Sequence, residues 1–434
     1  MASPIERDPS HVDASNAIAP SNAPNAAPKR APPSMVPVAT IEAWVKSFLR
    51  AKQTNGGWPT IYCKNRRASN LELLLDEGDD GCDAVGLGSK QVAKKMDGPG
   101  KRGYAGLLCA ISFCLELRKS GKSATQRELY YLHKGGEDSP WRTQAECNER
   151  AAAPGPAEPR RVDERPLARR SVADAATIFD CPRFALGITT SARGCCAGRL
   201  RWRTAGRAAA SAIPPRPRFE FFRAPRRGPW TSAFETTQMI QHDWMSDGAR
   251  EVESDARCVV VVEKDGIFRR LVEDRFFERY PCVLVTGMGV PDIATRALVH
   301  KLRGSLDVPV YGLVDWNSWG VGVLLCYKVG SARLGLEAVR YTVDVKWIGL
   351  RSSQVDRLEL PASCRQPLTA RDRRRAEGLL AHPWVATKPA WQRELRRQLD
   401  LGSKCELEAL FAGGDLDAVG AFIETAITTQ DYLE

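Results

Sequence analysis

The chain has 434 residues, enough for two or three domains with sizeable cores. Its composition is 43% hydrophobic and 26% charged, and no apolar run approaches the roughly 18–20 residues that cross a bilayer, so no membrane association is expected. The formal net charge is +11, but 18 arginines and only eight acidic residues lie between Trp141 and Trp230. Charge concentrated in one low-complexity block does not by itself identify a nucleic-acid-binding protein.

The N-terminal part predicts a tail followed by a helical domain. Residues 1–34 are rich in Ala, Pro, Ser and Asn and are expected to be disordered. Thr40 is the predicted N-cap of the first helix, because the apolar residues after it recur at helical spacing: Ile41, Trp44, Val45, Phe48 and Leu49. Leu71 to Leu75 reads as a short helix or strand, followed by an acidic loop.

A second pair of helices predicts a helix-turn-helix unit. Residues 104–118 have a strong helical pattern, and residues 119–122 form a Gly-containing turn. The next helix starts at Thr125, where Thr125 and Glu128 have the spacing of a capping box. Residues 35–134 are therefore expected to form a helix-turn-helix or winged-helix domain.

The middle of the chain, residues 135–254, is expected to consist of poorly ordered Arg- and Pro-rich insertions around a structured island at residues 172–202. The thirteen cysteines include no C-x-x-C pair, which argues against a zinc site and fits reduced thiols in an intracellular protein.

From residue 255 the pattern changes to alternating strands and helices, which predicts an α/β domain with a mostly parallel sheet over residues 255–434. The expected strands are 258–262, 282–285 and 308–314, and the expected helices are 267–278, 292–303, one from Gly322, and a charged helical tail from Thr369.

Two carboxylates follow strands of this sheet. Glu263 ends the first strand and Asp315 ends the third, with Asn317 two residues later. Ligands of open α/β sheets bind beyond the carboxyl ends of the strands, and carboxylate oxygens suit Mg²⁺. An acid after one strand is most often a solvated loop residue, whereas two acids after two matching strands make a magnesium site an even alternative.

Several motifs carry a resemblance. The stretches VVVVEKDGIFRRLVED (259–274), CVLVTGMGVPDIATR (282–296) and PVYGLVDWNSWG (309–320) are similar to the Toprim domain of topoisomerase VI A subunits and their meiotic recombination relatives. YKVGS (327–331), GLEAVRY (335–341) and VKWIGLR (345–351) continue the likeness and most resemble the plant-type second meiotic paralogue. The resemblance implies metal ligands at Glu263, Asp315 and Asn317, the last standing where the family usually has an acid.

The capped helix carries the expected nucleophile. The segment QRELYY (126–131) resembles the catalytic motif of this family, which implies that Tyr131 attacks DNA. Arg127 lies four residues earlier on the same helical face, where it could hold the scissile phosphate. Taken in isolation, the same segment would more often be a surface helix with packing aromatics.

DNA contacts are expected from three basic residues. The island at residues 174–200 also resembles the family, and it contains Arg193. Together with Lys264 and Arg296 in the Toprim-like motifs, Arg193 is a candidate DNA-binding residue.

The resemblance implies a type IIB DNA topoisomerase-like enzyme that cleaves both DNA strands with Mg²⁺, forms a 5′-phosphotyrosyl link and initiates meiotic recombination in the nucleus. The partners that it implies are double-stranded DNA, an A-type paralogue or a second copy of this chain, and an ATP-binding B-type subunit. The chain itself has no P-loop.

Two alternatives remain open at this point. The chain could be a catalytically weak or inactive DNA-binding scaffold paired with an active paralogue, which Asn317 and the unmatched middle segment favour. It could also be a phosphotransferase or primase-like Toprim enzyme that uses only the acidic site.

Overall fold

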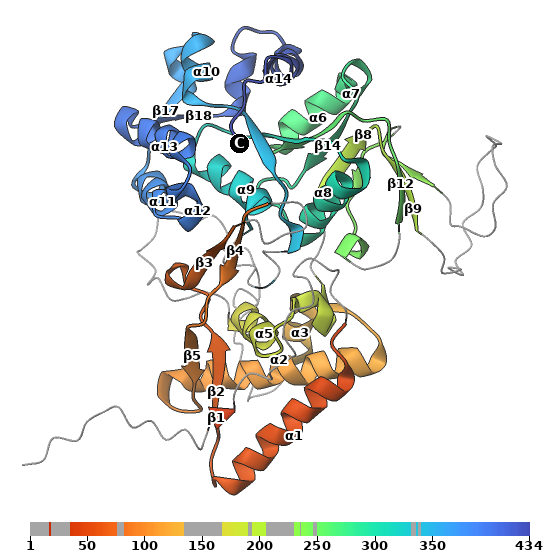
Figure 1. Cartoon of the computed structure of the whole chain (residues 1–434), viewed down its shortest axis with the longest axis vertical. Coiled ribbons are helices and arrows are strands. Elements are labelled where there is room, and N and C mark those ends of the chain that lie inside the picture. The colour runs from red at the N-terminus through yellow and green to blue at the C-terminus, as the bar shows by residue number, and fades with distance from the viewer. Residues whose placement is uncertain are drawn as a thin grey trace, which may run out of the picture. The chain divides into compact units, whose positions relative to one another are not determined.

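The computed structural model describes residues 17–18, 35–75, 82–133, 167–189, 193–204, 230–234, 236–245, 250–330, 336 and 340–434. These residues form two compact units (Figure 1). Among the described residues, those in 17–18, 35–70 and 87–189 belong to unit 1, and those in 71–86 and 193–434 belong to unit 2. The chain therefore passes between the units near residues 70, 86 and 189, which differs from the predicted succession of segments 35–134, 135–254 and 255–434.

Unit 1 is mainly helical. Its elements are β1 (Ala17–Ile18), α1 (Val38–Thr54), β2 (Thr60–Lys64), β5 (Gln91–Lys94), α2 (Lys101–Ser120), β6 (Ala124–Thr125), α3 (Gln126–His133), α5 (Leu167–Ile178) and β7 (Ile188–Thr189). Strands β2 and β5 pair antiparallel. The core between the helices includes Trp44, Phe48, Tyr104 and Ile111, all buried.

Helix α1 starts earlier than predicted. It begins at Val38, directly after Pro37, so Thr40 lies in the first turn and is not the N-cap. Proline fixes its own φ and ends the extended segment before a helix, so the proline and not the threonine marks this helix start. Ile41, Trp44 and Phe48 are buried as predicted, whereas Leu49 is 49% exposed.

A short turn and β6 connect α2 to α3. Helix α2 ends at Gly121, whose φ of 65° is the left-handed conformation that glycine adopts at a helix C-terminus. The predicted capping box is confirmed: Thr125 N–H donates to Glu128 Oε2 (2.5 Å), and Glu128 N–H donates to Thr125 Oγ1 (3.3 Å).

Unit 2 is built on a six-stranded sheet in the order β11-β8-β14-β13-β15-β16. The four strands β14, β13, β15 and β16 are mutually parallel, while β8 runs antiparallel to β14 and β11 antiparallel to β8. The sheet strands are β8 (Cys195–Gly198), β11 (Gln238–Met239), β13 (Cys258–Val262), β14 (Cys282–Thr286), β15 (Val310–Leu313) and β16 (Val345–Gly349). The mostly parallel α/β sheet was predicted, but β8, β11 and β16 were not.

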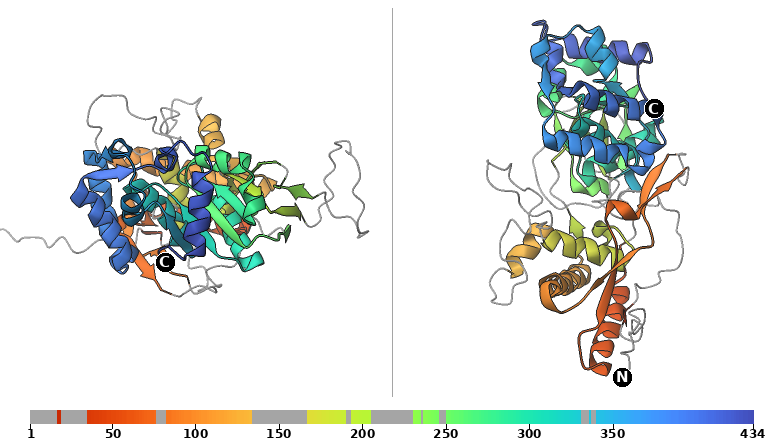
Figure 2. Two further views of the ribbon diagram at one scale, coloured as in Figure 1. Left: turned by 90° about the horizontal axis from the view of Figure 1, so that it is seen from above. Right: turned by 90° about the vertical axis from the view of Figure 1, so that its left-hand side faces the viewer.

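Helices cover both faces of this sheet. They are α6 (Asp265–Glu273), α7 (Phe276–Arg279), α8 (Ile293–Leu306), α9 (Ser318–Lys328), α10 (Ser352–Arg357), α11 (Ala370–Leu380), α12 (Pro383–Ala386), α13 (Pro389–Leu401) and α14 (Ala418–Thr428), with a 3-10 turn, η8 (Leu407–Phe411), before α14. The blue C-terminal helices α10 to α13 gather on one side of the unit (Figures 1 and 2).

The remaining strands of unit 2 form short pairs. They are β3 (Leu71–Leu74) with β4 (Ala84–Leu87), β9 (Arg201–Thr204) with β10 (Thr231–Ser232) and β12 (Arg250–Glu253), and β17 (Arg365–Pro367) with β18 (Ser403–Cys405). The β3–β4 pair docks on the C-terminal helices, because Asp83 Oδ2 accepts a hydrogen bond from Trp384 Nε1 (2.8 Å).

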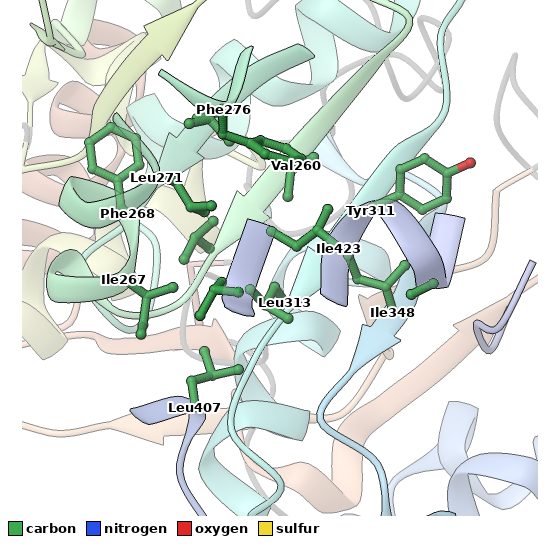
Figure 3. Packing of buried hydrophobic residues seen from close by; sticks show 14 of the residues in the cluster. Val260, Ile267, Phe268, Leu271, Phe276, Tyr311, Leu313, Ile348, Leu407 and Ile423 are labelled. Atoms are coloured by element: carbon green, nitrogen blue, oxygen red, sulfur yellow. The ribbon is translucent and has the colours of Figure 1, made fainter. Parts of the chain in front are cut away.

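The sheet is buried on both faces, as its continuous β-branched runs predict. All residues of β13 and β14 are buried. On one face Val260, Leu313 and Ile348 pack against Ile267 and Phe268 of α6 and Ile423 of α14 (Figure 3). This packing fixes where the strands end, and hence where the residues after them lie.

Two helix boundaries of unit 2 differ from prediction. The helix expected at 267–278 is divided into α6 and α7, because Arg275 adopts a φ of 48° between them. The helix expected from Gly322 begins at Ser318, since Asn317 caps it.

Most of residues 1–34, the Arg- and Pro-rich blocks 134–166 and 205–229, and parts of GLEAVRY lie outside the described residues. The island at 172–202 is divided: α5 belongs to unit 1 and β8 to unit 2, so it is not a separate insertion. None of the helices in the described part of the chain could cross a membrane.

Candidate active site

Helix α3 presents Tyr131 to solvent. Leu129 is fully buried and Tyr130 is 1% exposed, so these two side chains anchor the helix in the core of unit 1. Tyr131, by contrast, is 50% exposed. The rings of Tyr130 and Tyr131 meet edge to face, with centroids 5.3 Å apart. The buried neighbour thereby supports the exposed ring, and the phenol is accessible to a polymeric substrate.

Arg127 is also exposed on α3. Its spacing of four residues from Tyr131 places both on the same face of the helix. A guanidinium and a phenol on one exposed face can approach the same phosphate group.

The two predicted acids of unit 2 lie together. Strands β13 and β15 are parallel neighbours, with Val262 opposite Leu313, so the residues that follow them lie at the same edge. Asp315 N–H donates a hydrogen bond to Glu263 Oε2 (3.0 Å). Both side chains are buried, at 9% exposure for Glu263 and 4% for Asp315. We call these two residues the acid pair.

Close packing of α9 holds the acid pair in place. Gly320, in the first turn of α9, lies so near that a Cβ atom there would be 3.1 Å from Glu263 Oε2 and in collision with the Asp315 backbone oxygen. Only glycine fits this position without displacing the carboxyl groups.

Asn317 has a structural role at the same edge. Its Oδ1 accepts hydrogen bonds from Trp319 N–H and Gly320 N–H (both 2.8 Å), which caps α9. Its Nδ2 donates to Asp315 Oδ2 (3.3 Å). Because the amide oxygen serves the helix, its use as a metal ligand would break both cap hydrogen bonds.

Lys264 lies inside the site and is surrounded by acids. Its Nζ is 3.4 Å from Asp315 Oδ2 and 2.9 Å from Glu406 Oε2, and it also pairs with Glu408 Oε2. Leu407 N–H, between those two glutamates, donates to Asp315 Oδ1 (2.8 Å). Lys264, which was predicted to bind DNA, is the counter-ion of this cluster in the structure.

Sequence reasoning missed Glu406 and Glu408. They precede and enter η8, more than 140 residues after Lys264. The sequence ELE at 406–408 is too short to signal a site, so only the three-dimensional structure could bring it to the acid pair.

Both carboxyl groups of the acid pair have raised pKa values. Burial and the neighbouring charge of Asp315 raise the pKa of Glu263 from its ordinary 4.5 to about 7. Burial likewise raises the pKa of Asp315 from 3.8 to about 6, against the opposing charge of Lys264. Burial alone would lower the pKa of Lys264, but its hydrogen bonds to Glu408 and Glu406 and the charge of Asp315 raise it.

This arrangement fits a magnesium ion that keeps several waters. Glu263 Oε1 accepts no hydrogen bond from the residues that the structure describes, which leaves an oxygen for a cation. In the same part of the chain no three His, Cys, Asp or Glu side chains are arranged as a metal-binding group. Two carboxylates completed by water and phosphate oxygens are a common magnesium environment.

The other predicted DNA-binding residues have different surroundings. Arg296 is 0% exposed in α8, so the structure gives it a core position instead of the DNA-facing position predicted from the sequence. Arg193 is partly buried, and its backbone N–H donates to Asp292 Oδ2 (2.7 Å) at the N-terminus of α8.

The sequence of the chain is similar to those of known proteins. The family model for the Toprim domain of topoisomerase 6 A-subunits and Spo11 matches residues 258–425. "Meiotic recombination protein SPO11-2" of Oryza sativa subsp. japonica is 32% identical over 324 residues, which is 74% of this chain and 73% of the rice protein. The DNA topoisomerase 6 A-subunit of Arabidopsis thaliana is 35% identical over 188 residues, which is 43% of this chain and 44% of the Arabidopsis protein.

"Meiotic recombination protein SPO11" of Homo sapiens is 40% identical over 165 residues, which cover 38% of this chain and 42% of the human protein. The similarity to the rice protein extends well beyond the matched Toprim segment and confirms the resemblance read from the motifs. The chain belongs to the family of topoisomerase 6 A-subunits and Spo11 proteins.

Proposed function

We propose that the chain is a magnesium-dependent, DNA-cleaving transesterase of the type IIB topoisomerase kind, which makes double-strand breaks for meiotic recombination. The observation that carries this proposal is the acid pair, two buried acids at the ends of parallel strands, in which the Asp315 backbone N–H donates a 3.0 Å hydrogen bond to the Glu263 carboxylate. Family membership supplies the class of reaction.

Tyr131 is the proposed nucleophile. Its phenolic oxygen forms a bond to phosphorus, and the bond between phosphorus and the 3′ oxygen breaks. The 5′ phosphate stays on Tyr131, while the other end leaves as a 3′ hydroxyl that takes up a proton as the phenol gives one to solvent. Arg127, on the same face of α3, stabilises the negative charge of the phosphate during the attack.

Glu263 and Asp315 hold the cation in this proposal. Bound Mg²⁺ supplies positive charge to the reacting phosphate oxygens. Asp315 is oriented by Leu407 N–H, and Lys264 keeps Glu406 and Glu408 beside it. Asn317 contributes by capping α9 and donating to Asp315, which replaces its predicted role as a ligand.

The finer architecture follows from the same proposal. The α2–turn–α3 arrangement is the helix-turn-helix of a winged-helix domain, in which α3 faces double-stranded DNA. Each chain cuts one strand, so a double-strand break needs two A-type chains, either copies of this one or a paralogue, and an ATP-binding B-type subunit in the nucleus.

Covalent capture tests the proposal. Full-length protein with its partner subunits, duplex DNA and Mg²⁺ should yield DNA attached to protein through a denaturation-resistant bond. Tyr131→Phe should reduce the attachment by a factor on the order of 1000 or more, because phenylalanine has no oxygen to attack phosphorus. Tyr62→Phe, a change at a half-buried tyrosine in the same unit, is the matched control and should leave it intact.

A scaffold role is the second candidate, and Asn317 favours it, since the site has two acids where the resemblance implies three. Absence of attachment with wild-type protein in the complete assembly, alongside intact DNA binding, would support the scaffold. Attachment that survives Tyr131→Phe would contradict the proposed nucleophile.

A further inference from the structure

Helix α11 carries four arginines near its start, and the structure gives them two kinds of role. Arg375 Nε donates to the Ser318 carbonyl (3.0 Å), and Arg373 Nη1 donates to the Leu399 carbonyl (3.3 Å), so these two hold neighbouring helices. Arg371 and Arg374 are exposed, and Arg374 Nε donates to the Ala370 carbonyl within the same helix (3.2 Å). Their spacing of three residues puts them on one face of α11. We call them the arginine face.

The arginine face has no carboxylate counter-ion among the described residues. By contrast, Arg269 of α6 pairs with Asp265 and Arg303 of α8 pairs with Asp307, both at 2.7 Å. Asp372, the acid nearest in α11, is buried and bound by Thr369, Lys404 and Trp319. The positive charge of the arginine face is therefore available to a ligand from outside.

Contacts with α9 connect the arginine face to the acid pair. The guanidinium of Arg371 lies over the ring of Trp319, 4.8 Å from its centroid. Trp319 N–H donates to Asn317, which in turn donates to Asp315. Helices α9 and α11 are neighbours in Figure 1. Helix α9 thus carries the tryptophan on which Arg371 stacks, and the cap of the same helix contacts Asp315.

We propose that Arg371 and Arg374 form a phosphate-binding surface for the DNA strand that flanks the scissile position. A guanidinium offers paired N–H donors to phosphate oxygens, and stacking on Trp319 restricts Arg371 before the DNA arrives. The inference rests on the proposed function, since it assumes that DNA enters this site.

The salt dependence of DNA binding tests the arginine face. The measurement uses full-length Tyr131→Phe protein, which cannot cleave, and a labelled duplex. The slope of log K against log salt is negative, and each lost phosphate contact reduces its magnitude by about 0.9. Arg371→Gln with Arg374→Gln should therefore reduce the magnitude of the slope by about 1.8. The matched control, Arg269→Gln with Arg303→Gln, removes the same charge from paired arginines and should leave the slope unchanged.

An unchanged slope in the Arg371/Arg374 double variant would overturn the inference. Equal reductions in both double variants would also overturn it, because net charge alone would then explain the effect. Both pairs are on the surface, and an unaltered circular dichroism spectrum checks that each variant folds. Because no cleavage is involved, failure of covalent capture and failure of the arginine face are separate results.

Discussion

At the scale of single residues, the acid pair is held by backbone donors. Asp315 accepts from Leu407 N–H, Glu263 accepts from Asp315 N–H, and Asn317 is fixed by two N–H groups of α9. Backbone donors belong to elements that packing already fixes, so the carboxyl groups do not need to be ordered again when a substrate arrives. Burial raises the pKa values of both carboxyl groups, and the backbone hydrogen bonds act against this increase.

Metal binding should therefore depend steeply on pH. The pKa of Glu263 is about 7 and that of Asp315 about 6, and both carboxyl groups must lose their protons to bind a cation. Protons compete with the metal below these values, so Mn²⁺ affinity should rise by roughly tenfold or more between about pH 5.5 and pH 7.5. Calorimetric titration of the metal at both values measures the change.

Glu263→Gln serves as the control for this dependence, because it removes one of the two titrating groups. Its affinity should be weaker and should change less with pH. A wild-type affinity that stays constant over the whole range would contradict the assignment of the acid pair as the metal site.

At the scale of elements, short helices depend on their caps. Helix α3 has eight residues, which is too short to be stable by itself in water. The capping box of Thr125 and Glu128 at one end and the buried side chains of Leu129 and Tyr130 hold it in place. The position of Tyr131 thus depends on residues that take no part in the chemistry.

Loss of the cap should weaken both stability and cleavage. Thr125→Ala removes the acceptor for Glu128 N–H and should lower the free energy of unfolding by about 1 kcal/mol. DNA attachment should fall as well, because a frayed α3 misplaces Tyr131. Denaturant unfolding and covalent capture on the same preparation measure the two effects.

Thr428→Ala, at the exposed C-terminal end of α14, is a suitable comparison, since its hydroxyl only donates to the Glu424 carbonyl. It should change neither quantity appreciably. If Thr125→Ala behaved in the same way, the cap would have no part in positioning α3.

The elements also show what sequence could predict. The runs at 258–262 and 282–285 identified β13 and β14, and hence the position of Glu263, because buried strands need continuous apolar side chains. The capping box identified the start of α3. Strand β8 escaped prediction because its sequence, Cys195-Cys196-Ala197-Gly198, has no β-branched residue and pairs with β14 far along the chain.

The same limit applies to the site. Glu263 and Asp315 could be predicted, since parallel strands end at one edge. Glu406, Glu408 and the buried position of Arg296 could not, because local sequence does not specify which distant segment packs against a strand end.

At the scale of the whole molecule, nucleophile and acid pair belong to different units. The family resemblance implies that Tyr131 of one chain works with the acid pair of another. Mixed assemblies of Tyr131→Phe and Glu263→Ala chains test this arrangement. If the sites are shared between chains, each mixed pair contains one intact site, and single-strand nicks should appear.

The two variants assembled separately should give no nicks, which provides the control. If each site were built within one chain, the mixture would be equally inactive, because every site would carry one defect. Gel analysis of nicked plasmid against linear plasmid separates the two outcomes.

The route of the backbone limits how this protein could be divided. A fragment cut at residue 255 would keep the parallel strands but lose β8, so the outer edge of β14 would be bare. Bare edges recruit strands from other molecules. It would also lose β3 and β4, which are encoded in the first quarter of the chain. The two units therefore cannot be exchanged as continuous segments of sequence, either by protein engineering or by recombination of exons. The chain crosses between them at three places, and these connections would first have to be changed.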